Sequence, residues 1–128
     1  MQTVALIFAL AAAALHVLIF AMESVLWRRP AIWQRFNVAD QAQADATAQL
    51  AYNQGFYNLF LAIAAVVGPI LVWAGADVAG WTLTITAVAS MVAAACVLTT
   101  LGKEFVRPAL TQGVIPLAAL VLGILAIA

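Results

Sequence analysis

Polar side chains recur at helical spacing in two otherwise apolar stretches of the sequence. In the first, HVLIFAMESVLW, His16 and Glu23 lie seven residues apart and share one predicted helix face with Trp27. The second, NQGFYNLFLA, gathers amide and phenol groups within two helical turns: Asn53, Gln54, Tyr57 and Asn58. A His and a Glu can share or relay a proton, and amides and phenols can hold a carbonyl, hydroxyl or quinone-like oxygen. These residue types predict a polar site with acid–base capacity.

The composition places these polar groups in a membrane protein. Of the 128 residues, 67% are hydrophobic and 8% are charged, whereas a soluble domain is about half apolar. Four apolar stretches, about 3–27, 50–75, 80–101 and 110–128, are each near the ~20 residues that a membrane-spanning helix needs. We expect an all-α integral membrane protein in which residues 1–128 form a single transmembrane domain. Its predicted architecture is an antiparallel four-helix bundle with a short interfacial segment between the first and second helices.

The basic residues predict the orientation of the chain in the bilayer. All five lie in two connections, 28–48 and 102–110: Arg28, Arg29, Arg35, Lys103 and Arg107. The positive-inside rule places both connections in the cytoplasm and both termini outside. We expect a multi-pass membrane protein. The first stretch lacks a positively charged start and is long for a signal peptide, so we expect it to be retained.

The connection 28–48 is open to two interpretations. Asp40 or Asp45 suits the start of a short interfacial helix that leads into the second span; the alternative is a solvated linker. Trp27 and Trp33 suit the headgroup level, beside arginines that suit anionic lipid.

Depth estimates place the polar groups in the cytoplasmic half of the bundle. Glu23 lies roughly 6 Å inside the end of the first helix, and His16 lies roughly 10 Å deeper, at ~1.5 Å per residue. The amides lie just inside the start of the second helix, and Gln112 lies close to the cytoplasmic start of the fourth. The outer half is mostly alanine, valine, leucine and isoleucine. We therefore expect the polar pocket in the cytoplasmic half.

The amide face of the second helix is predicted to meet the first helix, because lipid would leave each amide unpaired at a cost of several kcal/mol. We expect Asn53 or Gln54 to hydrogen-bond Glu23. Tyr57 or Asn58 is expected nearer His16.

A second strip of the same helix carries small residues. Gly55 shares it with Ala51, Leu59 and Ala62. This strip is predicted to pack tightly on another helix, which makes Gly55 a contact point and not a hinge.

Each polar residue also has a purely structural interpretation. Glu23 is close enough to the helix end to reach water and pair with Arg28 or Arg29. His16 is too deep for that, but it could bond a neighbouring helix, and the amides could fasten one helix to the next. Taken together, the residues exceed what is needed to fasten one helix pair, which favours a functional pocket.

The two polar stretches resemble the signature segments of a small bacterial membrane-protein family catalogued as domain of unknown function 1304. HVLIFAMESVLW and NQGFYNLFLA match its first and second helices, and Gln112-Gly113 followed by Pro116 matches the start of its last helix. The resemblance covers essentially the whole chain. It implies a four-helix protein of the bacterial inner (plasma) membrane and supplies no activity.

Three functional hypotheses follow from the residues. The first is a membrane-embedded binding site or enzyme for a small apolar molecule or lipid. In it His16 and Glu23 act as acid and base, and the ligand contacts are Asn53, Gln54, Tyr57, Asn58 and Gln112. The second is a small proton-coupled transporter. The third is a non-catalytic subunit or assembly factor that packs on a partner through small-residue runs, and a homo-oligomer is equally open.

Other function classes find little support in the sequence. One His and one Glu are too few ligands for a closed zinc site. The chain has no phosphate-binding loop, no dinucleotide-binding loop and no nucleophilic serine motif. No basic patch suits nucleic acid, and the residues name no cofactor. The partner that the sequence does predict is the lipid bilayer, with the ligand and any catalysis left open.

Overall fold

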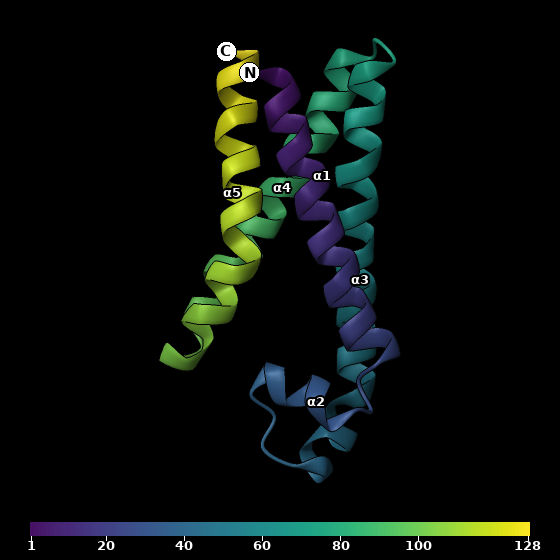
Figure 1. The fold of residues 1–128 in the computed structure, drawn as a ribbon, viewed down its shortest axis with the longest axis vertical. Helices are drawn as coiled ribbons and strands as arrows, with labels where there is room; N and C mark the ends of the chain where they lie inside the picture. The colour runs from purple at the N-terminus through teal and green to yellow at the C-terminus, as the bar shows by residue number, and fades with distance from the viewer.

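The computed structural model describes all 128 residues and is built of helices and their connections. The long elements are α1 (Gln2–Phe20), which continues into a π-helical turn η1 (Ala21–Val25), α3 (Gln41–Trp73), α4 (Asp77–Thr99) and α5 (Val106–Ile127). The short ones are α2 (Pro30–Trp33), the 3₁₀ turn η2 (Gln34–Phe36) and the 3₁₀ turn η3 (Lys103–Phe105). The chain crosses the bundle four times in alternating directions, so that both termini lie at one end (Figure 1). The predicted all-α antiparallel bundle is confirmed.

Four helical segments are long and apolar enough to cross a membrane: Gln2–Val25, Gln41–Trp73, Asp77–Thr99 and Lys103–Ile127. They coincide with the four predicted spans, and the protein is a multi-pass membrane protein. The second span is longer than expected. With 33 residues, α3 is about 50 Å long, which exceeds the ~30 Å bilayer core by several turns.

The four long helices form a ring in which each packs on two neighbours. α1 and α4 lie on opposite corners, and each packs on both α3 and α5. The main buried cluster is largely alanine: Ala9, Ala12, Ala13, Ala62, Ala65, Ala87, Val88, Met91 and Ala119. Small side chains at these positions let the helix backbones approach closely, which is how helices associate in lipid.

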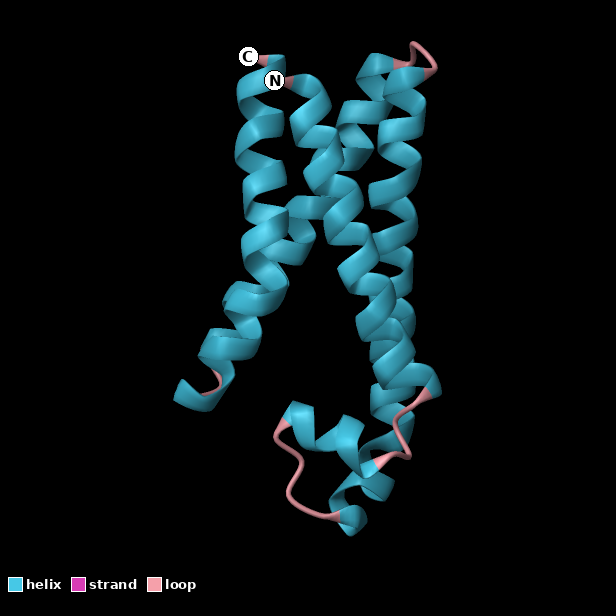
Figure 2. Cartoon of the chain, in the orientation of Figure 1, coloured by secondary structure: helices cyan, strands magenta, loops and turns pink.

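The bundle is tight at the end that holds the termini and divided at the other end. Near the termini, a Cβ on Gly68 of α3 would lie 2.9 Å from the carbonyl oxygen of Gly80 in α4. At the other end the π-helical turn η1 packs on α3 and α2. Figure 2 shows that the helices diverge at this end into two pairs, here called legs, with α1 and α3 in one leg and α4 and α5 in the other.

Pro116 explains the direction of the second leg. It lies inside α5, and its ring removes the N–H that would bond the carbonyl of Gln112 one turn earlier. Prolines inside helices produce bends for this reason. In Figure 1 the first half of α5 leans away from α1.

The connection between α1 and α3 folds back on the start of α3. Asp40 caps α3, because its side chain accepts a 2.8 Å hydrogen bond from the main-chain N–H of Gln43. In return, the side-chain oxygen of Gln43 accepts a 2.7 Å hydrogen bond from the main-chain N–H of Ala39. Helix α3 then continues unbroken into the second span. The predicted helix that starts at Asp40 and leads into the second span is therefore present as the first turns of α3, and the alternative of a plain linker is wrong.

The two tryptophans of this connection pack inside the protein, and their headgroup level stays a prediction. Trp27 and Trp33 are both buried and form a cluster with Ala44 and Ala51 of α3. Trp27 Nε1 donates a 3.0 Å hydrogen bond to the carbonyl oxygen of Ala44, whereas Trp33 Nε1 is buried with no acceptor. The cluster holds the connection against α3 because aromatic burial is favourable at a helix surface.

Candidate functional site

Glu23 lies in the π-helical turn that ends α1. The turn is closed by a 2.9 Å hydrogen bond from the Leu26 amide to the carbonyl of Ala21, five residues back. Such single wide turns are frequent at functional sites. The turn places the half-buried Glu23 side chain toward α3, where its Oε2 accepts a 2.9 Å bond from Asn58 Nδ2.

Gly55 brings α3 into close contact with this turn. A Cβ at Gly55 would overlap Ser24 Oγ and would lie 3.1 Å from the Cβ of Glu23. The close approach lets Ser24 Oγ donate a 2.8 Å hydrogen bond to the main-chain carbonyl of Tyr52. The prediction that Gly55 is a packing contact is confirmed, and its partner is the end of the first helix.

The amide that pairs with Glu23 differs from the predicted one. Asn53 and Gln54 are exposed and make no side-chain hydrogen bond, whereas Asn58 makes the bond to Glu23. The reason is helical geometry at about 100° per residue. Asn58 lies about 60° from the glycine that faces the first helix, and Gln54 about 100°, while Asn53 lies on the far side.

Tyr57 also points away from the first helix. Its side chain is 56% exposed, and its ring packs edge-on against Phe60, with centroids 6.4 Å apart. The expectation that Tyr57 or Asn58 lies near His16 is not met by any hydrogen bond.

His16 is separate from the Glu23 contact. Its side chain is 2% exposed, and Nδ1 bonds the carbonyl of Ala12 in its own helix at 2.9 Å. It makes no hydrogen bond to Glu23 or to the amides of α3. A proton could pass between His16 and Glu23 only through an intervening group.

Gln112 belongs to the other leg. It is half-buried on α5, one turn before Pro116, and makes no side-chain hydrogen bond. The predicted site residues therefore divide into one bonded pair, Glu23 and Asn58, and separate groups at His16 and Gln112.

A groove beside Glu23 adds residues that the sequence did not single out. It has a volume of about 360 Å³ and lies between η1 and the first turns of α3, lined by Glu23, Ser24, Val25, Trp27, Arg28, Ala48, Gln49 and Tyr52. Tyr52 is exposed, and its ring lies 5.0 Å from that of Phe56. The groove therefore combines a carboxylate, an amide and a guanidinium group with apolar walls.

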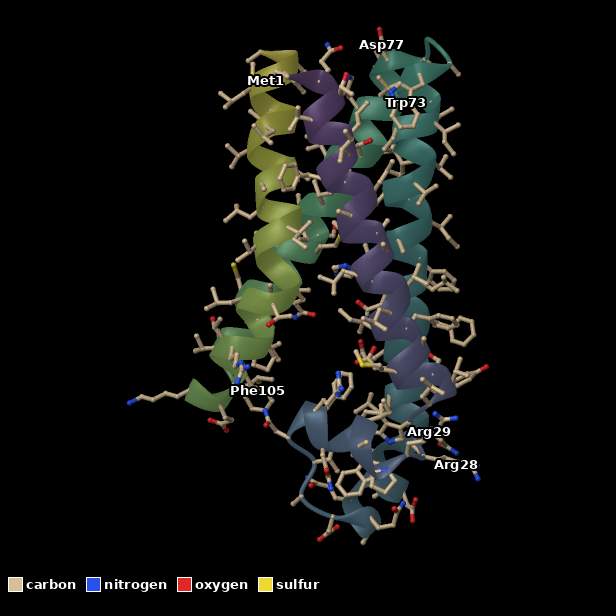
Figure 3. The ribbon with its side chains drawn as sticks, in the orientation of Figure 1. Met1, Arg28, Arg29, Trp73, Asp77 and Phe105 are labelled. Carbon is tan, nitrogen blue, oxygen red and sulfur yellow. The ribbon has the colours of Figure 1, made fainter.

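A second groove of about 400 Å³ adjoins the first and shares Trp27, Arg28 and Ala48 with it. Arg28 is exposed and lines both grooves, yet donates no hydrogen bond within the chain. Figure 3 shows Arg28 and Arg29 together at the end of the α1 leg, with Phe105 across from them on the other leg. The sequence signal for Arg28 was its position just after the span, where it was considered for orientation, for anionic lipid and as an ion-pair partner of Glu23.

The comparison with known families covers both polar stretches and the last helix. A model described as "Protein of unknown function (DUF1304)" matches residues 10–124. The chain belongs to this family. No curated protein and no solved structure matches it.

The contacts described above lie within the part of the chain that matches the DUF1304 family. The matched range contains the π-helical turn, the Gly55 contact and the bend at Pro116. It adds no reaction, ligand or partner. The chemistry of this DUF1304 chain has to be argued from Glu23 and its surroundings.

Proposed function

We propose that this DUF1304 protein binds a small amphipathic molecule from the bilayer at the groove beside Glu23, with Glu23 as an acid–base group. The observation that carries the proposal is the placement of Glu23. Its Oε2 is held by Asn58 at 2.9 Å, and the residue also lines a groove of about 360 Å³ with Arg28 and Tyr52. A carboxylate at membrane depth that is held by one partner and borders a groove is a functional candidate.

The proposal includes the orientation of the protein. The groove lies at the end of the bundle that carries Arg28 and Arg29, and the Lys103–Arg107 connection lies at the same end (Figure 3). The positive-inside rule assigns this end to the cytoplasm of a bacterial inner membrane and both termini to the outside. The ligand then enters from the cytoplasmic leaflet.

His16 has a secondary role in this proposal. It is buried two turns deeper than Glu23 and bonds only its own helix. It supplies a second proton-carrying group that a bound ligand or water would connect to Glu23. Asn58 holds the carboxylate, and Tyr52 and Gln49 take the ligand-contact roles expected for Asn53, Gln54 and Tyr57.

A matched pair of glutamate variants tests the proposal. The protein is purified in mild detergent, and the small molecules that stay bound are extracted and measured by mass spectrometry. Glu23→Gln is expected to lose the retained molecule, and Glu104→Gln, which changes the exposed glutamate of η3 outside the groove, is expected to keep it. Equal retention by the two variants contradicts a ligand role for Glu23.

A proton-coupled transporter is the second candidate, and the uneven packing of the bundle favours it. Buried clusters pack the helices together from Ala5, Leu6 and Trp81 near the termini to the alanine cluster at mid-helix, while the two legs diverge at the other end (Figure 2). Spin labels at Arg29→Cys and Arg107→Cys, in a Cys96→Ser background, measure the separation of the legs. Transport requires two distance populations whose ratio changes with pH, whereas a fixed binding site gives one.

A further inference from the structure

We infer that the ligand of this groove is a single-chain phospholipid that carries a free hydroxyl group between its phosphate and its acyl chain. The inference rests on the proposed function, since it names the ligand class of the same site. It is carried by a free guanidinium group and a half-bonded carboxylate that line the groove, and by an aromatic strip that meets the groove at Tyr52.

Arg28 is the phosphate contact. It lines both grooves, donates no hydrogen bond within the chain, and lies beside Arg29 in Figure 3. A guanidinium group matches the geometry of two phosphate oxygens and binds them by paired hydrogen bonds. Its place just past the end of the first span is the depth at which lipid phosphates lie.

Glu23 is the hydroxyl contact. It precedes Arg28 by five residues and lies within the first span, whereas Arg28 follows the end of the span, so Glu23 is the deeper of the two in the bilayer. Asn58 occupies Oε2 at 2.9 Å, and Oε1 has no partner in the chain. A second anionic group beside this carboxylate would be repelled, whereas a hydroxyl would donate a hydrogen bond to it. The order of phosphate first and hydroxyl deeper is the order in a glycerophospholipid that has lost its second acyl chain.

The aromatic strip is the contact for the acyl chain. It continues from the groove along the leg and consists of Tyr52, Phe56 and Phe60 of α3 with Phe20 of α1. Phe56 lies 5.0 Å from Tyr52, 6.3 Å from Phe60 and 5.2 Å from Phe20, measured between ring centroids. Tyr52 and Phe60 are 55% and 56% exposed. The three α3 rings follow one another at four-residue spacing and form a continuous apolar surface along which an acyl chain can lie.

Four defined molecules separate these contributions. The wild-type protein in a mild detergent is titrated with oleoyl lysophosphatidic acid, dioleoyl phosphatidic acid, monoolein and glycerol 3-phosphate. The last three lack the free hydroxyl, the phosphate and the chain, respectively. We expect lysophosphatidic acid to bind tightest and each omission to weaken binding about tenfold or more, as for the loss of a hydrogen bond to a charged group. Glycerol 3-phosphate that binds as tightly as the lipid would assign the site to a free phosphate and overturn the inference.

Two arginine variants give the matched control. Arg28→Gln is expected to lose the preference for lysophosphatidic acid over monoolein, and Arg107→Gln, an exposed arginine at the start of α5, is expected to keep it. If both variants weaken lysophosphatidic acid equally, the effect is general attraction between charges and the inference is wrong. If the molecule that copurifies with the wild type is lost in Glu23→Gln but contains no phosphate, the inference fails and the proposed function stands. If neither that molecule nor lysophosphatidic acid depends on Glu23, both fail.

Discussion

The contact between Gly55 and the π-helical turn gives the sharpest prediction about how the site is held. In Gly55→Ala the new Cβ would overlap Ser24 Oγ and would lie 3.1 Å from the Cβ atoms of both Ser24 and Glu23. The two Cβ atoms are attached directly to the backbone of the turn, so they can move away only if the turn itself shifts. The substitution should therefore push η1 away from α3.

The expected cost can be worked from three contributions. Overpacking costs about 1–3 kcal/mol, and losing the Ser24–Tyr52 hydrogen bond costs about 1 kcal/mol. The gain of alanine over glycine inside a helix offsets about 1 kcal/mol. We expect a net loss of about 1–3 kcal/mol in the free energy of unfolding.

Gly123→Ala is the control for this substitution. Its Cβ would meet the flexible tip of Ile85 at 2.8 Å, which can turn aside, so this variant should be neutral or stabilised by up to about 1 kcal/mol. Unfolding in mixed micelles with increasing denaturing detergent measures both variants. The double variant Ser24→Ala with Gly55→Ala removes the worst overlap and should recover part of the loss. If Gly55→Ala is as stable as Gly123→Ala, Gly55 is not a packing contact and the reasoning fails.

Three further predictions concern the carboxylate, the tryptophans and the topology. Glu23→Gln should unfold like the wild type, because it keeps an acceptor for Asn58. Glu23→Leu should cost about 1–3 kcal/mol, because it leaves one N–H of the Asn58 side chain unpaired while the same nitrogen stays bonded to the carbonyl of Gln54. Equal melting of the two variants in detergent would make the charge structural. Trp27→Phe should cost about 1 kcal/mol by removing the bond to a main-chain carbonyl, while Trp33→Phe, which removes a buried donor with no acceptor, should be neutral or stabilising in the same melts; the opposite order would refute this. A cysteine placed at 76–79 should react with an impermeant thiol reagent from outside the cell and one at 38–46 should not, and the reverse pattern would invert the proposed orientation.

The overall fold was predictable because lipid imposes simple demands on a sequence. A helix that crosses a bilayer must be long and apolar, so four such stretches specify four spans. The ends were less predictable. The start of α3 at Gln41 depends on the cap at Asp40, and a polar helical extension has no apolar periodicity to mark it. The burial of Trp33 depends on how its connection folds back, which composition does not specify.

The site was only partly predictable, because the argument from spacing assumed regular α-helix. The 3.6-residue period placed His16, Glu23 and Trp27 on one face, but the period is interrupted at Ala21, where the π-helical turn begins. A π-helical turn contains more residues than an α-helical one, so the side chains after it are rotated relative to the stripe before it. Apolar sequences that form such a turn carry no clear mark of it.

The face of α3 that meets this turn was decided by size more than by polarity. Each exposed amide gains at most a hydrogen bond from facing the first helix, whereas a glycine there brings two backbones together over a whole turn. That approach makes the Ser24–Tyr52 bond possible and leaves Asn58, at the edge of the contact, as the amide within reach of Glu23. Asn53 and Tyr57 are turned outward by the same choice. Glu23 thus lines a groove together with Arg28 and Tyr52, and on the proposal above its ligand is to be sought among molecules that move laterally in the membrane.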